Sequence, residues 1–282
     1  MKLIRLATVT VLTSTIFAGG VQAFATTENA PIFNHDTENN VEFRAGSEDI
    51  DDVENPIDQP PVIIPPLPAA GPLTIVHAPD SFNFGTQAIT SSEARYSLIA
   101  QEFEVDPEAD TDLEGFVPYV SLVQVSDTRG DATADWTLSF SLSPFEAQNS
   151  DDTLNGAQLV FTNPLVTHNK LHNSPEAPEI LLTNQQNNNV VLDATNTSVD
   201  ILHAGNNQGQ GRSTIYWGDQ EDLMAQYDAL NDADSEFSGP ILNNHIQLVL
   251  PATAAPNADR YSATLTWNLS STIGTEGENN PE

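Results

Sequence analysis

The chain of 282 residues contains no cysteine and has only eight lysine and arginine residues, against 40 aspartate and glutamate residues. Without cysteine, neither a disulfide framework nor a cysteine-ligated metal is available, so a hydrophobic core must stabilise the fold. The formal net charge of −32 excludes nucleic acid as a partner, because no basic stripe is present to neutralise phosphates. The same charge argues against binding to anionic lipid surfaces.

Long hydrophobic runs are also rare, and the run at the N-terminus is short. Lys2 and Arg5 precede about a dozen apolar residues, too few to span a bilayer, and small residues follow at Ala23 and Ala25. This pattern predicts a secretory signal peptide over residues 1–25, with an uncleaved anchor as the less favoured alternative. Residues 272–282 form an acidic tail, so we expect no membrane span and no signal for covalent attachment to a cell wall.

Residues 26–70 are acidic at first and then rich in proline. Ten acidic side chains between Glu28 and Asp58 accompany a single basic residue, Arg44, and a proline-rich run follows at residues 59–68. An acidic segment without hydrophobic periodicity cannot bury enough apolar surface to offset its ordering entropy. We therefore expect a disordered linker, acidic and then extended, with a proline-rich docking ligand as the alternative.

Short apolar segments separated by turn residues make up most of residues 71–271. This pattern predicts an all-β domain of many short strands, a single β-sandwich or a barrel-like fold. The dense apolar run at 117–125 is expected to be a central strand buried on both faces. One short helix is expected around residues 221–227, and residues 164–178 are expected to form a loop.

Two segments share the pattern Trp-x-Leu. Trp136 and Leu138 alternate with hydroxyl residues in segment 136–142, and Trp267 and Leu269 do so in segment 261–269. A period of two predicts half-buried strands. The tryptophans are then either core residues, which this pattern favours, or a partly exposed aromatic platform.

These segments resemble the signatures of the WxL-domain surface proteins of Gram-positive bacteria, which carry a central Trp-x-Leu and a C-terminal Tyr-x-x-x-Leu-Thr-Trp-x-Leu beginning here at Tyr261. An opening segment at 73–85, an Asp-x-Arg-Gly segment at 127–130 and a closing pair of strands, expected to be a hairpin, also match. The resemblance implies a secreted protein at the cell surface, held non-covalently to cell wall peptidoglycan. It also implies assembly with other WxL-family or WxL-interacting surface proteins.

The candidate binding residues, which are equally candidate structural residues, are the family-signature positions: Trp136, Leu138, Trp267, Leu269, Asp127, Arg129 and Tyr261. For Asp127 and Arg129 two interpretations stay open. An Arg–Asp pair pins the turn, which we favour, or the pair forms a polar clamp for a carboxylate of a wall peptide.

Catalytic and metal-binding patterns are weak. His168 and His172 lie four residues apart in an expected loop, and the alternating acids of residues 106–114 lack the EF-hand spacing. No Gly-x-Ser-x-Gly motif is present, and no pair of carboxylates stands out. We therefore expect a non-catalytic protein without metal or cofactor, with calcium at 106–114 as an open alternative.

The expected function is non-covalent association with peptidoglycan within a surface protein complex. The alternative is an assembly subunit that binds a partner surface protein and contacts the wall only indirectly. A hydrolase that modifies the wall ranks last.

Overall fold

The structure is a computed structural model that describes residues 52–68, 71–130, 135–170, 176–205 and 207–271. All of these belong to one compact unit, Phe43–Glu282. The predicted signal peptide, residues 26–51 of the predicted linker, His172 and the acidic tail lie outside the described residues. Over the described ranges, no helix is long and apolar enough to cross a membrane.

Strands dominate the described part of the chain. In chain order the elements are β1 (Val62–Ile63), β2 (Leu73–His77), β3 (Ala94–Ile99), β4 (Gln101–Val105), β5 (Phe116–Tyr119), β6 (Ser121–Asp127), β7 (Trp136–Leu142), β8 (Glu146–Ala147), β9 (Gln158–Thr162), β10 (Leu165–Lys170), β11 (Glu179–Ile180), β12 (Asn189–Asp193), β13 (Val199–Ala204), β14 (Gly211–Trp217), helix α1 (Gln220–Asn231), β15 (Leu242–Leu250), the short 3₁₀ helix Ala252–Ala254, β16 (Tyr261–Ser262) and β17 (Leu265–Ser270).

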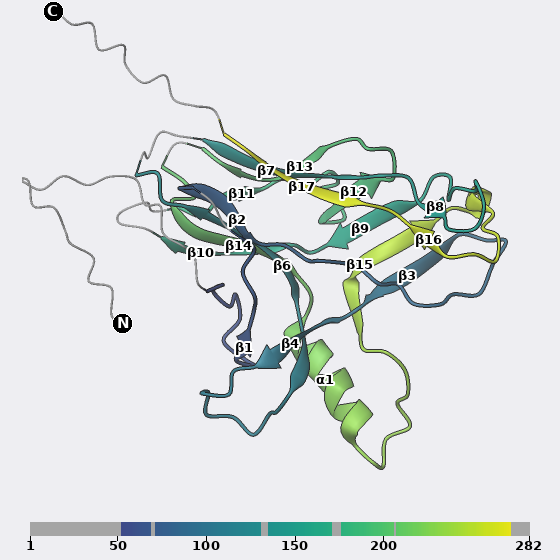
Figure 1. Cartoon of the computed structure of the whole chain (residues 1–282), viewed down its shortest axis with the longest axis horizontal. Helices are drawn as coiled ribbons and strands as arrows, with labels where there is room; N and C mark the ends of the chain where they lie inside the picture. Colours follow the sequence, from purple (N-terminus) through teal and green to yellow (C-terminus); the bar gives the residue numbers. More distant parts are fainter. Residues whose placement is uncertain (1–51, 69–70, 131–134, 171–175, 206, 272–282) are drawn as a thin grey trace, which may run out of the picture. The chain divides into compact units, whose positions relative to one another are not determined.

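The strands form several small antiparallel sheets (Figure 1). Three sheets of four strands have the orders β10-β14-β6-β2, β11-β13-β7-β17 and β12-β9-β15-β3, while β1-β4-β5 and β16-β8 form smaller ones. The all-β prediction is confirmed. The strands of the described residues are nevertheless divided among several sheets, rather than between the two facing sheets of a single sandwich.

The main hydrophobic core lies between the three four-stranded sheets. Each of these sheets contributes one ring to a chain of aromatic contacts. Phe140 of β7 lies 5.1 Å from Phe161 of β9, which in turn lies 5.1 Å from Trp217 of β14. These edge-on and tilted contacts join the three sheets through one continuous apolar interior.

A second core lies between the β1-β4-β5 sheet and helix α1. Strand β6 separates the two cores: Leu122 is buried in the second, and Val123 and Val125 are buried in the main one. The predicted central strand is therefore confirmed as a segment buried on both faces. It is broken at Val120, whose amide donates to Gln220 Oε1 at 3.1 Å, so that β5 and β6 belong to different sheets.

Residues 52–68, which the sequence analysis assigned to a disordered linker, pack against the second core. Val62 and Ile64 are buried, β1 pairs with β4, and the Tyr119 hydroxyl donates to the Ile57 carbonyl at 2.7 Å. The predicted boundary at Gly71 is therefore wrong for these residues. Two apolar side chains between the prolines, those of Val62 and Ile64, are buried in the second core. The prolines are compatible with this position because β1 is an edge strand, where a missing backbone N–H breaks no hydrogen bond of the sheet interior.

Two further predictions are corrected by the strand pairing. Strand β10 occupies part of the expected loop at 164–178 and pairs with β14 over its full length. The closing strands do not form a hairpin, because β15 pairs with β3 and β9, whereas β17 pairs with β7. The predicted helix is confirmed as α1, which begins after Asp219, whose side chain accepts hydrogen bonds from the amides of Glu221 and Asp222.

Candidate functional site

The first Trp-x-Leu strand, β7, lies inside its sheet between β13 and β17. Trp136 is 1% exposed, and Leu138 is fully buried in the main core. Gly209 packs so closely on the indole that an added Cβ would lie 2.8 Å from Trp136, and its φ of +69° also suits glycine. Trp136 therefore fills the core, and the geometry does not favour its use as an exposed platform.

The second Trp-x-Leu strand, β17, forms the edge of the same sheet and pairs with the first. Trp267 lies opposite Phe140 and Leu269 lies opposite Leu138. The rings of Trp267 and Phe140 stack at 5.1 Å with an interplanar angle of 14°. Trp267 is half-buried, and the residues between these apolar positions are exposed. The two motifs thus form one paired unit, in which the first is central and the second is peripheral.

Asp127 and Arg129 form a two-pronged ion pair at the end of β6. Arg129 Nε and Nη2 donate to the two carboxylate oxygens of Asp127 at 2.9 and 2.8 Å. The Asp127 side chain is fully buried and the Arg129 side chain is 15% exposed. Arg129 Nη1 also donates to Ser271 Oγ at 3.0 Å, just beyond β17. The pair therefore holds the turn after β6 against the end of β17, and this geometry favours the structural interpretation over the ligand clamp.

Tyr261 lies apart from these residues, beside a groove of about 960 Å³. One wall of this groove is the segment 79–89, and the other includes β16 and the start of β17. Half-buried Tyr261 accepts a hydrogen bond at its hydroxyl from the Asn257 amide at 2.9 Å. At the rim, hydrogen bonds from Asn149 hold the pKa of the Asp259 carboxyl below its ordinary value. The groove combines apolar and aromatic walls with a polar rim, which is typical of small-ligand sites.

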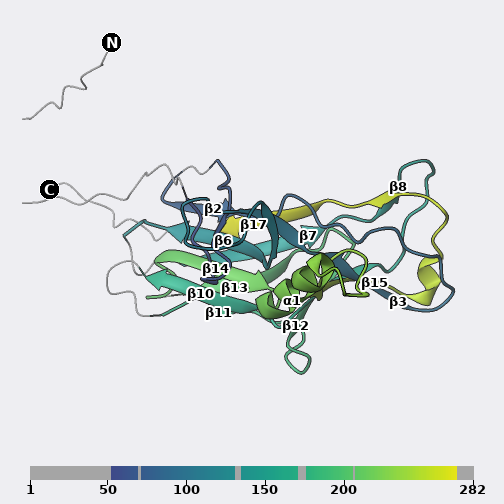
Figure 2. The same cartoon turned by 90° about the horizontal axis from the view of Figure 1, so that it is seen from below.

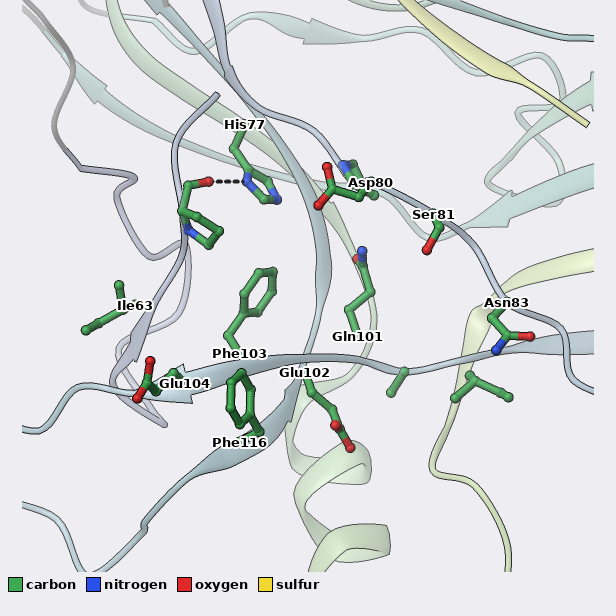
Figure 3. A pocket seen from close by; sticks show the side chains of 14 residues that line it. Ile63, His77, Asp80, Ser81, Asn83, Gln101, Glu102, Phe103, Glu104 and Phe116 are labelled. Atoms are coloured by element: carbon green, nitrogen blue, oxygen red, sulfur yellow. Dashed lines mark hydrogen bonds between the residues drawn. The ribbon is translucent and has the colours of Figure 1, made fainter. Parts of the chain in front are cut away.

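A second pocket, of about 520 Å³, lies on the other side of segment 79–83, next to the start of β4 (Figure 3). His77 and Gln101 line it, and the sequence analysis selected neither residue. The available signal was weak: His77 ends an apolar strand, and Gln101 begins one that alternates polar and apolar residues. Only the fold brings β2 and β4 together.

The signature residues therefore do not converge on one site. Trp136 and Leu138 lie on the strand that pairs with the strand of Trp267 and Leu269. The Asp127–Arg129 ion pair lies at a second position, and Tyr261 lies at a third, beside the groove. In the described ranges, no group of three or more histidine or acidic side chains could hold a metal ion. Residues 106–115 form an exposed connection between β4 and β5, in which Asp106 Oδ1 accepts from the Glu108 amide at 2.9 Å.

Comparison with known proteins identifies the family. No curated protein and no solved structure matches the chain. A family model described as WxL domain surface cell wall-binding matches residues 32–272. This match contains every described residue from 52 to 271, including both Trp-x-Leu strands. The chain therefore belongs to the WxL domain surface cell wall-binding family and is a protein of the extracellular cell-wall surface.

Proposed function

We propose that the chain binds the peptidoglycan of the Gram-positive cell wall directly and non-covalently, without catalysis, as one component of a surface protein complex. The observation that carries this proposal is the family match over residues 32–272, which includes the whole described fold. The groove beside β16 and β17 is the surface we assign to the wall ligand. Its volume of about 960 Å³ is at the upper end of small-ligand sites, and an elongated polymer could follow it.

The test is co-sedimentation of the purified full chain with insoluble peptidoglycan stripped of protein. The chain should pellet with the wall, and Tyr261→Ala should pellet less, because the ring forms part of the groove wall. Tyr261→Phe keeps the ring and should retain most of the binding. Phe237→Ala removes an exposed ring outside the groove and serves as the matched control.

A second candidate function is that of an assembly subunit whose direct ligand is a partner surface protein. The edge position of β17 favours it: within the described residues, no strand pairs with the outer side of β17, so its backbone could pair with a strand from another chain. Failure to pellet with protein-free peptidoglycan, combined with pelleting on walls that retain their proteins, would support this second function. Release of soluble wall fragments during the same incubation would contradict the non-catalytic assignment.

A further inference from the structure

The pocket next to β4 lies between the end of β2 and segment 79–83 on one side and the β1-β4-β5 sheet on the other (Figure 3; Figure 2 shows the fold from below). Its volume of about 520 Å³ is within the range of small-ligand sites. It is separate from the Trp-x-Leu strands, and none of the family-signature residues lines it. It shares Pro79, Asp80, Ser81 and Asn83 with the groove assigned to the wall ligand, whereas His77 and Gln101 line this pocket and are not among the groove's lining residues.

His77 presents a hydrogen-bond acceptor toward this pocket. Its side chain is only 6% exposed, and Nδ1 lies 2.9 Å from the Pro65 carbonyl. A carbonyl oxygen only accepts, so Nδ1 carries the proton, and in the neutral ring Nε2 is then an acceptor. Burial lowers the pKa of His77, which favours the neutral ring. Among the residues that the structure describes, the buried Nε2 has no hydrogen-bond partner.

Gln101 supplies a second acceptor of the same kind. Its buried side-chain oxygen, Oε1, likewise has no hydrogen-bond partner within the described part of the chain. Figure 3 shows the Gln101 amide and the His77 ring pointing into the same space from opposite sides. Buried acceptors without donors are unfavourable, so a ligand that brings N–H groups into this space gains hydrogen bonds that the free protein lacks.

The charges around the pocket are all of one sign. Asp80, Glu102 and Glu104 are among the described residues that line the pocket, and no lysine or arginine is among them. Asp80 lies close enough to His77 to act on it electrostatically. Anionic ligands are therefore repelled, whereas a cation that carries N–H donors is attracted.

Apolar side chains complete the site. Ile63 and Phe116 lie on the two strands that flank Glu104 and are directly opposite it in the sheet. They are 48% and 60% exposed, and Phe103 packs its ring against His77 deeper in the pocket, with the ring centroids 5.8 Å apart. Gln101 and Phe103 point to the inner face of β4, whereas Ile63, Glu104 and Phe116 share its outer face. An aliphatic stem that ends in a cation fits beside Phe103, because its methylenes pack on apolar groups and its charge is attracted to aromatic faces. Ile63 and Phe116 lie at the outer border of the pocket.

We propose that this pocket binds a lysine or arginine side chain of a polypeptide partner, with the N–H groups donating to His77 Nε2 and Gln101 Oε1. A polypeptide is favoured because Ile63 and Phe116, exposed at the two outer strands of the sheet, form an apolar border that a protein surface can cover. The net charge of −32 also attracts a basic partner at long range.

The test is a titration of the ¹⁵N-labelled full chain, followed by NMR, with Nα-acetyl-arginine amide, Nα-acetyl-lysine amide and Nα-acetyl-norleucine amide. Norleucine has an aliphatic stem like that of lysine but no charge. We expect saturable shifts at the amides of His77, Gln101 and Phe103 with the two cations, with a Kd on the order of 1 mM. Norleucine should bind about tenfold more weakly, and binding equal to that of the cations would overturn the proposal.

Two variants test the proposed contacts. Gln101→Leu should weaken arginine binding about tenfold, since it removes one of the two acceptors. Phe116→Ala, on the outer face of the sheet, should weaken binding of the arginine compound by less than about threefold. Gln186→Leu and Phe237→Ala replace exposed residues of the same types outside both the pocket and the groove, and these variants should bind arginine as the unmodified chain does. Unfolding midpoints measured alongside confirm that each variant is folded. Unchanged arginine binding in Gln101→Leu, or no saturable shift with either cation, would contradict the proposal.

The source of the cation is decided by two comparisons. A soluble stem-peptide fragment of peptidoglycan with a free amine should bind no more tightly than the arginine compound. Gln101→Leu should still pellet with peptidoglycan. Tighter binding of the fragment, or loss of pelleting in this variant, would make the pocket a wall subsite and overturn the polypeptide assignment. Loss of pelleting in Tyr261→Ala alone concerns only the proposed wall-binding function.

Discussion

At the scale of single residues, the two signature tryptophans have different environments although their local sequences are alike. Trp136 is enclosed by the core, with Gly209 against its ring, whereas Trp267 is half-buried on an edge strand and stacks on Phe140. Alternation along the chain correctly predicted that both have an inward-facing side chain. It could not distinguish them, because burial depends on which strand lies next to each one in the sheet.

The first prediction concerns this difference. Trp136→Ala should lower the free energy of unfolding by about 3–5 kcal/mol, since it leaves a large cavity, and Trp267→Ala should lower it by about 1–3 kcal/mol. Urea denaturation of the two variants measures both values. An equal loss in the two variants would contradict the assignment of Trp267 to a peripheral position.

The second prediction uses the buried Asp127–Arg129 pair. Arg129→Ala leaves a fully buried carboxylate without its partner and should destabilise the fold by about 3–5 kcal/mol. Asp127→Asn leaves a guanidinium that is partly exposed and keeps an acceptor for the Arg129 amide, so its effect should be smaller. If urea denaturation showed Asp127→Asn to be less stable than Arg129→Ala, the charge of Arg129, and not that of Asp127, would be the one that needs an oppositely charged partner.

The third prediction concerns the buried imidazole of His77, whose pKa is below its ordinary value of 6.5. As the pH falls, the unfolded chain takes up this proton first, so the unfolded state binds more protons. The contribution of His77 to the free energy of unfolding should therefore be constant above about pH 6.5. It should decrease as the pH falls from there toward the pKa of His77 in the folded protein.

The variant His77→Asn keeps a donor for the Pro65 carbonyl and should lose part of this acid sensitivity. Urea midpoints at pH 7 and pH 5 measure the effect, with His245→Asn as a control that removes a histidine outside the pocket. The same acid sensitivity in both variants would argue against the role of His77.

At the scale of elements, the N-terminal stretch around β1 belongs to the fold. A chain that begins at Gly71 would lose the burial of Val62 and Ile64 and the hydrogen bond from Tyr119 to Ile57. The fourth prediction is that it is less stable than a chain that begins at Phe43 by at least about 3 kcal/mol, because each buried aliphatic side chain contributes about 1.5–3 kcal/mol. Limited proteolysis of the full chain should yield a core that retains residues 52–68, and a core trimmed to Gly71 would contradict this.

The existence of the elements was easier to predict than their partners. Local sequence patterns located the helix α1, the strand β6 and the two Trp-x-Leu strands: a dense apolar run indicated β6, and a period of two indicated the Trp-x-Leu strands. Pairing is not local: β15 and β17 are close in sequence, yet each joins strands far back in the chain. The candidate pocket was missed for the same reason, since His77 and Gln101 are brought together only when the sheets pack on one another.

At the scale of the whole molecule, the charge restricts how the wall is bound. Loss of Lys2 and Arg5 with the predicted signal peptide changes the net charge from −32 to about −34, so a polyanionic wall repels the chain at long range. Binding must then depend on short contacts. Because salt screens charges over about 10 Å at 0.1 M, added salt should weaken the repulsion and leave these contacts intact.

The fifth prediction is therefore that co-sedimentation with peptidoglycan stays constant or increases from low to moderate salt. Pelleting measured across a sodium chloride series at constant pH tests it, with a wall-free sample at each salt concentration as the control for aggregation. A steep decrease in binding with rising salt would indicate attraction between opposite charges instead.

The pairing of β17 with β7 also has a consequence for the order in which the protein can be made. Ser139 and the Asn268 carbonyl are hydrogen-bonded across 129 residues of chain, and Trp267 completes the stack on Phe140. The chain is synthesised from its N-terminus, so β7 exists well before its edge partner β17 does. Contacts this distant in sequence form slowly. Until β17 has been made, one edge of β7 has no strand paired with it and Phe140 lacks the stacked ring of Trp267, so this sheet is completed only when almost the whole chain has been synthesised.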